Sequence, residues 1–591
     1  MNPFPFIGGS YAARSPAFDA QRTVNLYPET SGSGNSKSVA MLVGTPGLVF
    51  WATLPTFPIR GFLRVSASLA LVAAGAVLYS VTTAGAFTPI GAIAPGLTPV
   101  SMASDGVYVM IVTGLQGYFL VLSTMALSLI VNAAFVGADV VDFLDGFFVF
   151  NTPNTKEFQI TGLYAETIAA LDFASSEALP DTLLTLIVDH DELWLFSSAH
   201  TEVWSNVGAA LFPFQRIQGA VIEQGCAAKH SVCKLDNTVV WLTADDRGQG
   251  TVQKAVGYTP QRISNHALEY AIASYPRIDD AVGYSYQQEG HLFYMLTFPT
   301  GKATWCFDTA TELWHERAWR DPVSGQLSQH RSICHMAYAG LNIVGDYQNG
   351  NLYSLDLDTY TDYGNILPAI RQCPHIAQGN VWQFFSKLWI DMQMGVGTEG
   401  APNAPFTAQY TVTAAASGNS IGYAAGYGSV VTNYDSQTWG NPVTMQVVNG
   451  RQPYFYWATV IRPYDYVTLT SDAGTVTLSL AASGTTFNAA GGIMGNTFYP
   501  VSAVPWTAGR TYIVTFYPAP VDPSLILDWS DDGGQSFGSQ LTVSLGKIGE
   551  RRARAIFRRL GKSRDRVFRA TITDPVKRIF IGAGCDFTVG S

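Results

Sequence analysis

A short pattern that recurs up to Ala339 constrains the fold more than any other feature of this sequence. A small or acidic residue is followed by a second turn-forming residue and then by an apolar or aromatic triplet, as in Asp105-Gly106 before Val107-Tyr108-Val109. Later copies begin at Asp145, Asp191, Asp236, Glu289 and Ala339, and Ala74-Gly75 lies upstream. The copies that follow Asp105 are separated by 40, 46, 45, 53 and 50 residues. Steps of this size are typical of the blades of a β-propeller.

The residue types fit a tight hairpin that is followed by a buried strand. Such a hairpin needs positive φ angles, which Gly, Asn and Asp tolerate, and the strand after it must bury large β-forming side chains against its neighbours. Most copies are followed by a second strand of the same kind, found at Gly117-Tyr118-Phe119, Thr201–Trp204, Thr304–Asp308 and Asn349–Tyr353. Two hairpins make a four-stranded blade, so we expect an all-β chain with a propeller of six to seven irregular blades. A β-sandwich in which turn dipeptides recur by chance is the alternative.

Composition supports many short strands in a globular chain. Glycine and proline occur 56 and 30 times, only 13% of residues are charged and 47% are hydrophobic. The nearly charge-free stretch 66–86 is interrupted by turn residues, so we expect strands there and no membrane-spanning segment. The six cysteines show no zinc or redox spacing and are expected to be reduced. The amino terminus has no basic, apolar signal, which predicts synthesis and assembly in a cytoplasm.

A change in amino-acid composition near residue 395 indicates an inserted domain. No lysine occurs between Leu388 and Gly546, and segments such as Thr475–Leu480 alternate polar and apolar residues. Such alternation is typical of half-buried strands, so we expect an inserted β-sandwich. We expect four parts. Residues 1–57 form an amino-terminal segment that docks to a platform, a part of the subunit outside the propeller, and to the propeller itself, which is residues 58–397. Residues 398–521 form the inserted β-sandwich, and 522–591 a basic β segment that returns to the platform or the propeller.

Positive charge concentrates at the carboxyl end. From Leu541 onward there are 12 Lys and Arg against 4 Asp and Glu, which leaves 22 basic and 40 acidic residues in the rest of the chain. The cluster consists of Arg551, Arg552, Arg554, Arg558, Arg559, Lys562, Arg564, Arg566 and Arg569. It could neutralise DNA phosphates or dock on an acidic protein surface. We favour docking, because a conduit that held phosphates tightly would slow the passage of DNA, whereas acidic walls let it slide.

One motif raises the alternative of an enzyme. Ser530, Asp532, Gly534, Ser536 and Phe537 follow the Asp-box pattern of sialidase-type propellers, in which the box is a hairpin turn remote from the chemistry. Glycoside hydrolysis needs two suitably spaced carboxylates, or a Tyr nucleophile with arginines, and a single box is weak evidence for either. We therefore interpret the box as a structural turn.

The run from Asp189 to Glu192 also collects groups that could bind a metal. Neighbours on a strand face opposite sides, and the run lies at a turn of the repeat, so we interpret it as a solvated turn. The sequence contains no phosphate-binding glycine loop, zinc spacing or nucleophile elbow. We expect no catalytic residue, no cofactor and no metal.

Several segments resemble the packaged-DNA stabilisation, or tail nozzle, proteins of short-tailed bacteriophages. The resemblance opens with Arg22–Glu29 and Leu42–Leu48, and it continues at Val203–Gly208, Phe212–Arg216, Gly225–Ala228 and Pro260–Ser264. It resumes at Leu388–Gly397, Asp522-Pro523, Ser530–Gly534, Arg558–Gly561 and Arg564–Arg569. The interruption between Gly397 and Asp522 departs from the family pattern, and the role of this insertion cannot be carried over.

The resemblance implies a structural virion protein and not an enzyme. Such a protein forms a ring, with six copies expected, below the head–tail adaptor; it closes the portal channel, retains packaged double-stranded DNA without sequence specificity, and conducts it during ejection. It also implies contacts with tailspikes or tail fibres and with a tail plug or needle. Two other functions stay open from the sequence: a carbohydrate-active, sialidase-like propeller enzyme, and a host-receptor binding module made by the insertion.

Overall fold

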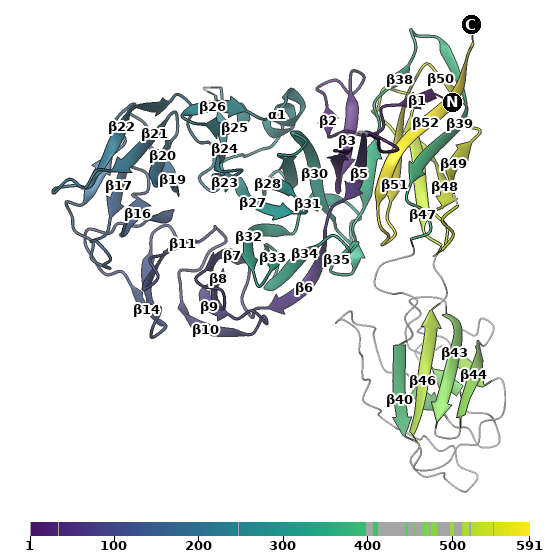
Figure 1. The fold of residues 1–591 in the computed structure, drawn as a ribbon, viewed down its shortest axis with the longest axis horizontal. Helices are drawn as coiled ribbons and strands as arrows, with labels where there is room; N and C mark the ends of the chain where they lie inside the picture. The colour runs from purple at the N-terminus through teal and green to yellow at the C-terminus, as the bar shows by residue number, and fades with distance from the viewer. Residues whose placement is uncertain are drawn as a thin grey trace. The chain divides into compact units, whose positions relative to one another are not determined.

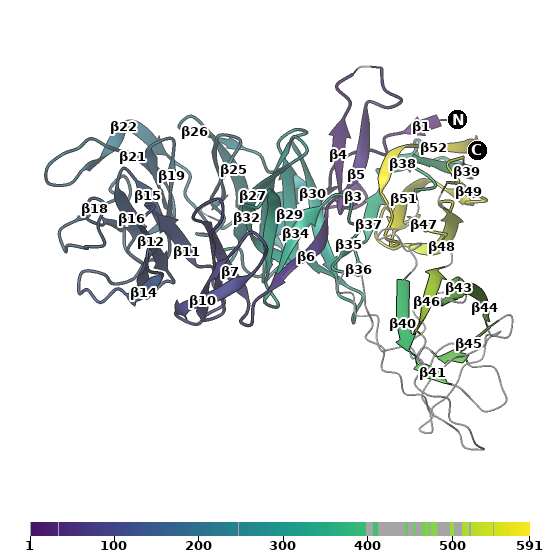
Figure 2. The same cartoon turned by 60° about the horizontal axis from the view of Figure 1, so that its bottom comes forward.

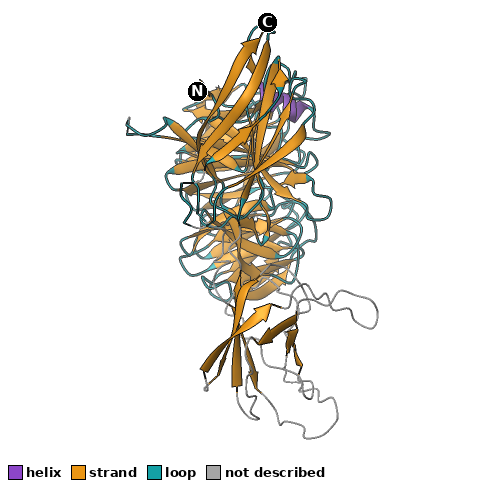
Figure 3. Ribbon diagram, turned by 90° about the vertical axis from the view of Figure 1, so that its right-hand side faces the viewer, coloured by secondary structure: helices purple, strands orange, loops and turns teal. Residues whose placement is uncertain are grey.

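The computed structural model describes residues 2–33, 35–245, 247–396, 522–547, 549–552 and 554–590, together with the backbone of seven strands of the inserted segment. The chain forms two compact units. The main unit consists of residues 1–393, 524–544 and 554–591, and the inserted unit of residues 394–523 and 545–553. Strands dominate the described residues, with a single α-helix among them (Figure 3). The all-β fold class expected from the sequence is confirmed.

Five four-stranded antiparallel sheets and parts of two larger sheets form the seven blades of a propeller in the main unit (Figure 1). Blade 1 consists of β7 (Ile59–Arg64), β8 (Ala70–Ala74), β9 (Val77–Val81) and β10 (Phe87–Ala92). Blade 2 consists of β11 (Ser101–Ser104), β12 (Tyr108–Val112), β13 (Gly117–Val121) and β14 (Ala126–Leu129). Blade 3 consists of β15 (Val141–Leu144), β16 (Phe147–Asn151), β17 (Glu157–Ile160) and β18 (Phe173–Ser175). Blade 4 consists of β19 (Leu183–Asp189), β20 (Glu192–Ser197), β21 (Thr201–Asn206) and β22 (Phe214–Ile222). Blade 5 consists of β23 (Cys233–Leu235), β24 (Thr238–Ala244), β25 (Gly250–Val256) and β26 (Thr259–Arg262). Blade 6 consists of β27 (Val282–Gln288), β28 (His291–Phe298), β29 (Ala303–Asp308) and β30 (Leu313–Arg320).

The amino-terminal segment closes the ring of blades. Blade 7 takes three strands from late in the propeller, and its fourth strand comes from the start of the chain: β32 (Ser332–Tyr338), β33 (Leu341–Asp346), β34 (Asn351–Asp356) and β6 (Gly47–Thr53). β6 pairs with β34 in antiparallel register, with Leu48 opposite Leu355. The innermost strand of blade 1, β7, packs against β32 of blade 7. The ring therefore depends on pairing between segments about 300 residues apart.

The repeat expected from the sequence marks the turn between the first two strands of blades 2 to 7, whereas in blade 1 the upstream copy Ala74-Gly75 lies between the second and third strands. Asp145 and Gly146 have φ angles of +49° and +90°, and Glu289 and Gly290 have +48° and +84°. Blade 4 differs by one residue from the expectation. Its turn residues are His190 (+49°) and Asp191 (+59°), not Asp191-Glu192, because Glu192 already pairs with Asp189 as the first residue of β20.

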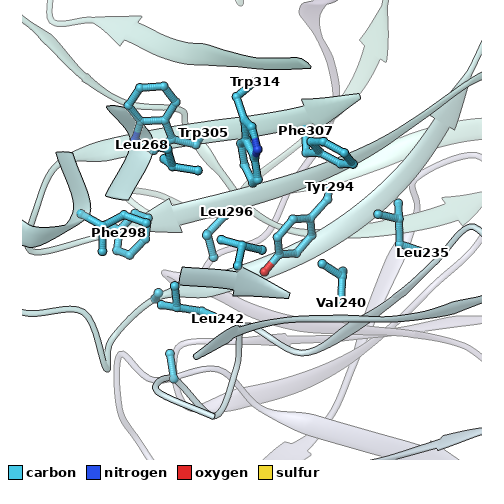
Figure 4. Packing of buried hydrophobic residues seen from close by; sticks show 14 residues of the cluster. Leu235, Val240, Leu242, Leu268, Tyr294, Leu296, Phe298, Trp305, Phe307 and Trp314 are labelled. Atoms are coloured by element: carbon cyan, nitrogen blue, oxygen red, sulfur yellow. The ribbon is translucent and has the colours of Figure 1, made fainter. Parts of the chain in front are cut away.

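Large apolar side chains fill the spaces between neighbouring blades. Figure 4 shows the cluster between blades 5 and 6, where Tyr294 and Trp314 are at most 1% exposed. The helix α1 (His266–Ala273), which the side chain of Asn265 caps at the backbone N–H of Leu268, adds two more apolar residues to this cluster. Full burial of one such side chain stabilises the fold by roughly 1.5–3 kcal/mol. Blade-to-blade burial is thus the main source of propeller stability.

The rest of the main unit is a two-sheet β-sandwich, whose layers are seen from another side in Figure 2. One sheet contains β1 (Asn2–Phe4), β4 (Leu26–Thr30), β5 (Ala40–Gly44), β39 (Trp382–Met392), β49 (Ala555–Arg558), β50 (Lys562–Ser563) and β52 (Ile579–Gly590). The other contains β2 (Tyr11–Ala12), β3 (Ala20–Val24), β37 (Ala369–Gln372), β38 (Ile376–Ala377), β47 (Ser524–Ser530), β48 (Gly538–Ser544) and β51 (Asp565–Ile572). The rings of Phe385 on β39 and Phe568 on β51 pack edge to face between the two sheets, 5.8 Å apart.

The sandwich is continuous with the propeller. β3 pairs with β30 of blade 6, which also pairs with β31 (Leu327–Gln329), and the short strands β35 (Thr361–Asp362) and β36 (Asn365–Ile366) extend blade 7. The sequence predicts a propeller over 58–397, but in the structure β37, β38 and β39 of that range belong to the sandwich, and β6 from the amino-terminal range belongs to a blade. Pairing partners so far apart in sequence could not be inferred from local patterns.

A buried arginine holds the amino-terminal segment in the sandwich. Arg371 is fully buried, and its guanidinium donates to the carbonyl of Phe6 at 2.6 Å, to Gln21 Oε1 at 2.7 Å and to Thr23 Oγ1 at 2.8 Å. Because a buried guanidinium is costly unless its donors are satisfied, these bonds fix the path of residues 6–23.

In the inserted unit the described strands form one antiparallel sheet. Its strand order is β40-β46-β43-β44-β45-β42-β41. The strands are β40 (Phe406–Thr411), β41 (Thr444–Gln446), β42 (Tyr454–Tyr456), β43 (Tyr464–Ser471), β44 (Gly474–Leu480), β45 (Thr497–Pro500) and β46 (Thr511–Pro518). The remaining residues of the expected 398–521 domain lie outside the described residues.

Candidate docking surface

The nine cations that the sequence groups together have different environments in the structure. Arg551 and Arg552 are exposed and belong to the inserted unit, whereas the other seven belong to the main unit. Arg554 is exposed just before β49. Of the remaining six, two are tied into the sandwich by ion pairs and four are exposed on one edge of it.

Arg566 and Arg569 hold the sandwich together. Arg566 is 1% exposed; it donates to both carboxylate oxygens of Asp531 at 2.7 and 2.8 Å and to the carbonyl of Leu560 at 2.5 Å. Arg569 donates to both oxygens of Asp528 at 2.9 and 2.5 Å. Bidentate pairs of this kind fix geometry as well as adding energy. These two arginines are not available to an outside partner, which corrects the expectation of a single nine-residue docking cluster.

The other four cations form a surface that we call the basic edge: Arg558, Arg559, Lys562 and Arg564. All four are exposed, and they lie on or next to β49 and β50, the strands that pair with β39 along one side of its sheet. Lys562 pairs with Phe384 and Arg558 pairs with Lys387 in this register. The basic edge therefore follows the first half of β39.

Aromatic rings of β39 lie beneath these cations. The Lys562 ammonium is 4.6 Å and the Arg564 guanidinium 4.8 Å from the centroid of the Trp382 ring, and Phe384 is 44% exposed. Cation–π contacts hold the two charged groups in place at modest cost in solvation. Within the described part of the chain, no carboxylate lies within 4.0 Å of any of the four cations, although the nearby Lys387 contacts Asp586 at 3.4 Å. The basic edge thus presents positive charge without ion-pair partners in the described chain, beside the exposed ring of Phe384.

The Asp-box residues form the turn between β47 and β48. Asp532 Oδ1 accepts the backbone N–H of Gln535 at 3.0 Å and of Ser536 at 2.9 Å, and Ser530 Oγ accepts the N–H of Gly534 at 2.8 Å. Hydrogen bonds from Ser530 and Ser536 lower the pKa of the Asp532 carboxyl. The ring of Phe537 lies under the Arg569 guanidinium, 4.0 Å away. The side chain of Asp532 is thus occupied in organising its own turn.

The acidic run in blade 4 does not form a metal site in the structure. Asp189 Oδ2 contacts His190 Nδ1 at 2.8 Å, and this hydrogen bond raises the pKa of the exposed imidazole. Among the residues described, no three His, Cys, Asp or Glu side chains are grouped so that they could hold a metal ion. The six cysteines are all unbridged. No helix in the described ranges is long and apolar enough to span a membrane.

Comparison with known families decides the identity. The β-propeller of bacteriophage P22 Gp10 matches residues 2–360, which is more than half of the chain, and the β-sandwich of the same protein matches residues 509–587. The chain belongs to the bacteriophage P22 Gp10 family. It is therefore a structural protein of a bacteriophage tail and a component of the virion. The resemblance identified in the sequence is confirmed.

Solved structures give more distant matches to this member of the P22 Gp10 family. YCF48 bound to a D1 peptide is 11% identical, with a TM-score of 0.35 over 53% of this chain and 97% of that chain. The computationally designed Ika8 protein is 11% identical, with a TM-score of 0.32 over 57% and 100%. A chain of the mitotic checkpoint complex is 9% identical, with a TM-score of 0.33 over 53% and 91%. No curated protein sequence matches the chain.

Sequence reasoning missed a buried polar network in blade 4. His200 is fully buried, with Nδ1 2.8 Å from Asp181 Oδ1 and Nε2 3.0 Å from Ser176 Oγ. Glu202, also fully buried, lies 3.5 Å from the same Nε2 and accepts the backbone N–H groups of residues 177 and 178. These are the residue types of a hydrolase triad, but Ser176 is fully buried and cannot reach a substrate. The network instead ties the segment before β19 to β21.

The charge state of this network predicts a pH dependence of stability. Burial lowers the pKa of His200, but the hydrogen bond to Glu202 and the charge of Asp181 outweigh it, so the folded pKa lies above the ordinary value. A raised pKa contributes stability below the unfolded pKa of about 6.5, and that stability is lost as pH rises through the folded pKa. We expect the melting temperature of the wild type to fall over this window. In His200→Gln the fall should be smaller than in the wild type, because His190 still titrates over the same window, and an unchanged slope in thermal melts of this variant would contradict the assignment.

Proposed function

We propose that the chain is the tail nozzle subunit of a short-tailed bacteriophage. Six copies form a ring below the head–tail adaptor, close the portal channel, retain packaged DNA and conduct it during ejection. Tailspikes or tail fibres and a tail plug or needle bind to this ring, which is assembled in the host cytoplasm. Membership of the P22 Gp10 family is the single observation that carries this proposal.

The physical character of the chain is consistent with a mechanical role. Seven blades closed by a strand from the opposite end of the propeller segment make a rigid wall, because opening the ring requires the β6–β34 pairing to break along its length. Acidic residues outnumber basic ones by 40 to 22 before Leu541, and negative walls repel DNA and let it slide. We assign no catalytic residue, cofactor or metal to this function.

The sandwich attaches the subunit to the tail, and the basic edge is its docking surface for an acidic protein. Trp382 and Phe384 beside arginines have the composition of interface hot spots, which are rich in Trp and Arg. The two cations that lie against Trp382 cover part of its ring, so that surface is less suited to stacking on nucleic-acid bases than to presenting donors to carboxylates.

Retention of DNA tests the function. If the chain closes the channel, tail-less particles filled with DNA should leak their genome, and addition of the wild-type chain should protect that DNA from added nuclease. Particles that bind the chain in full amount and still lose their DNA would contradict the proposed closure.

Reversal of charge on the basic edge tests the docking assignment. Arg558→Glu combined with Arg559→Glu should leave the monomer folded, because both side chains are exposed and form no ion pair in the described chain. We expect this variant to melt within about 2 °C of the wild type, as is usual for surface substitutions, and to fail to add to tail-less particles. Normal addition of the folded variant would remove the basic edge from the docking surface.

A further inference from the structure

The basic edge is an open edge of a β-sheet as well as a charged surface. In the described chain β49 and β50 pair only with β39, and no strand pairs with their outer sides. Isolated proteins keep such edges from associating by placing charge on them, as the four cations do here. A partner of opposite charge would remove that protection and bury the aromatic surface of Trp382 and Phe384.

The propeller of the same chain supplies a surface of opposite charge. The turns between the first and second strands of blades 3 to 6 carry the exposed carboxylates of Asp145, Asp191, Asp236 and Glu289, which we call the acidic turns. The innermost strands of all blades run in the same direction in a propeller, so these four turns lie on one face of the ring. Asp236 contacts Lys254 at 2.7 Å, and the other three have no ion-pair partner within the described chain.

Within one chain the two surfaces do not meet. No ion pair among the described residues joins the basic edge to the acidic turns, so in an isolated copy the four cations and three of the four carboxylates have no ion-pair partner in the described chain. Two different surfaces that complement each other on identical subunits give a head-to-tail contact, and such contacts close into rings when the rotation allows it. A second copy can therefore satisfy the surface that the first copy leaves open.

We infer that the basic edge of one copy docks on the acidic turns of a neighbouring copy. This inference rests on the proposed ring and names the partner of its docking surface. The contact pairs Arg558, Arg559, Lys562 and Arg564 with carboxylates of blades 3 to 6 and buries the exposed aromatic surface of β39. An acidic surface of the adaptor and the phosphates of DNA are the competing occupants.

Charge exchange between the two surfaces distinguishes these occupants. The edge variant carries Arg558→Glu and Arg559→Glu, the turn variant carries Asp191→Lys and Glu289→Lys, and the exchange variant carries all four substitutions. A control variant, Arg64→Glu with Lys302→Glu, reverses two exposed propeller cations that form no ion pair in the described chain. Thermal melts first establish that every variant is folded. Sedimentation of the purified chains over a wide concentration range then measures self-association without particles.

We expect the wild type, the control variant and the exchange variant to form the same oligomer. The edge and turn variants should each associate more weakly by a factor on the order of 100, because like charges then face one another. An exchange variant that stays monomeric, an edge variant that still assembles, or a wild type that is monomeric at every concentration would overturn the inference. DNA retention by the wild type is a separate measurement, so failure of this contact is distinguishable from failure of the nozzle assignment.

Discussion

Replacement of Trp314 with alanine is expected to lower the free energy of unfolding of the main unit by about 3–5 kcal/mol. The indole is 1% exposed between blades 5 and 6, and its Nε1–H donates to the carbonyl of Ile263 at 2.8 Å. Its ring packs against that of Phe307, with centroids 5.2 Å apart. The substitution removes this packing, leaves a cavity and orphans a buried carbonyl. Equilibrium unfolding in urea measures the change.

The conservative variant Trp314→Phe separates packing from hydrogen bonding. It keeps most of the ring and loses the N–H donor, so its cost should be about 1–3 kcal/mol. If Trp314→Ala cost less than Trp314→Phe, blade-to-blade burial would not be the main source of stability in this region.

Replacement of Arg566 with alanine is expected to destabilise the sandwich by about 2–5 kcal/mol, because a large buried side chain and its hydrogen bonds are lost, while the Asp531 carboxylate is 45% exposed and stays solvated. The guanidinium is enclosed by aromatic rings, with that of Phe385 centred 4.6 Å and that of Trp529 5.2 Å away. Alanine would leave the Leu560 carbonyl without its donor and Asp531 without its cation. Urea unfolding monitored by fluorescence of the sandwich tryptophans measures this loss.

Arg558→Ala is the matched control for Arg566→Ala. Arg558 comes from the same basic run of sequence but is exposed and has no ion pair in the described chain, so its replacement should change stability by at most about 0.5 kcal/mol. Equal effects of the two substitutions would contradict the division of the cluster into structural and docking arginines.

The turn pattern predicted the fold because it reports on local backbone geometry. Asp145, Asp236 and Glu289 occupy positive φ angles as the first turn residues of their blades, and this requirement is visible in single residues. In blade 4 the pattern was displaced by one position, since His190 has no strong turn signature of its own. The closing strand β6 carried no local signal at all, because its identity as a blade strand depends on β34, far along the chain.

The candidate site could be predicted only in part for the same reason. Sequence shows that cations are concentrated near residues 551–569, but Arg566 is buried, unlike Arg564, and its ion-pair partner Asp531 lies 35 residues away. The buried group around His200 joins the segment before β19 to β21 and had no recognisable spacing, although His200 and Glu202, two residues apart, were a visible hint of a charged network. The charge pattern of the sequence thus predicted where the basic surface lies. Which of its arginines are available to a partner depends on ion pairs with residues far away in the sequence.

An image of purified tails by electron microscopy tests the central claim most directly. The account predicts a closed ring of six copies around the DNA path below the adaptor, with propeller and sandwich density in every copy. Separate copies that stand away from the channel axis, or an open helical array, would contradict it.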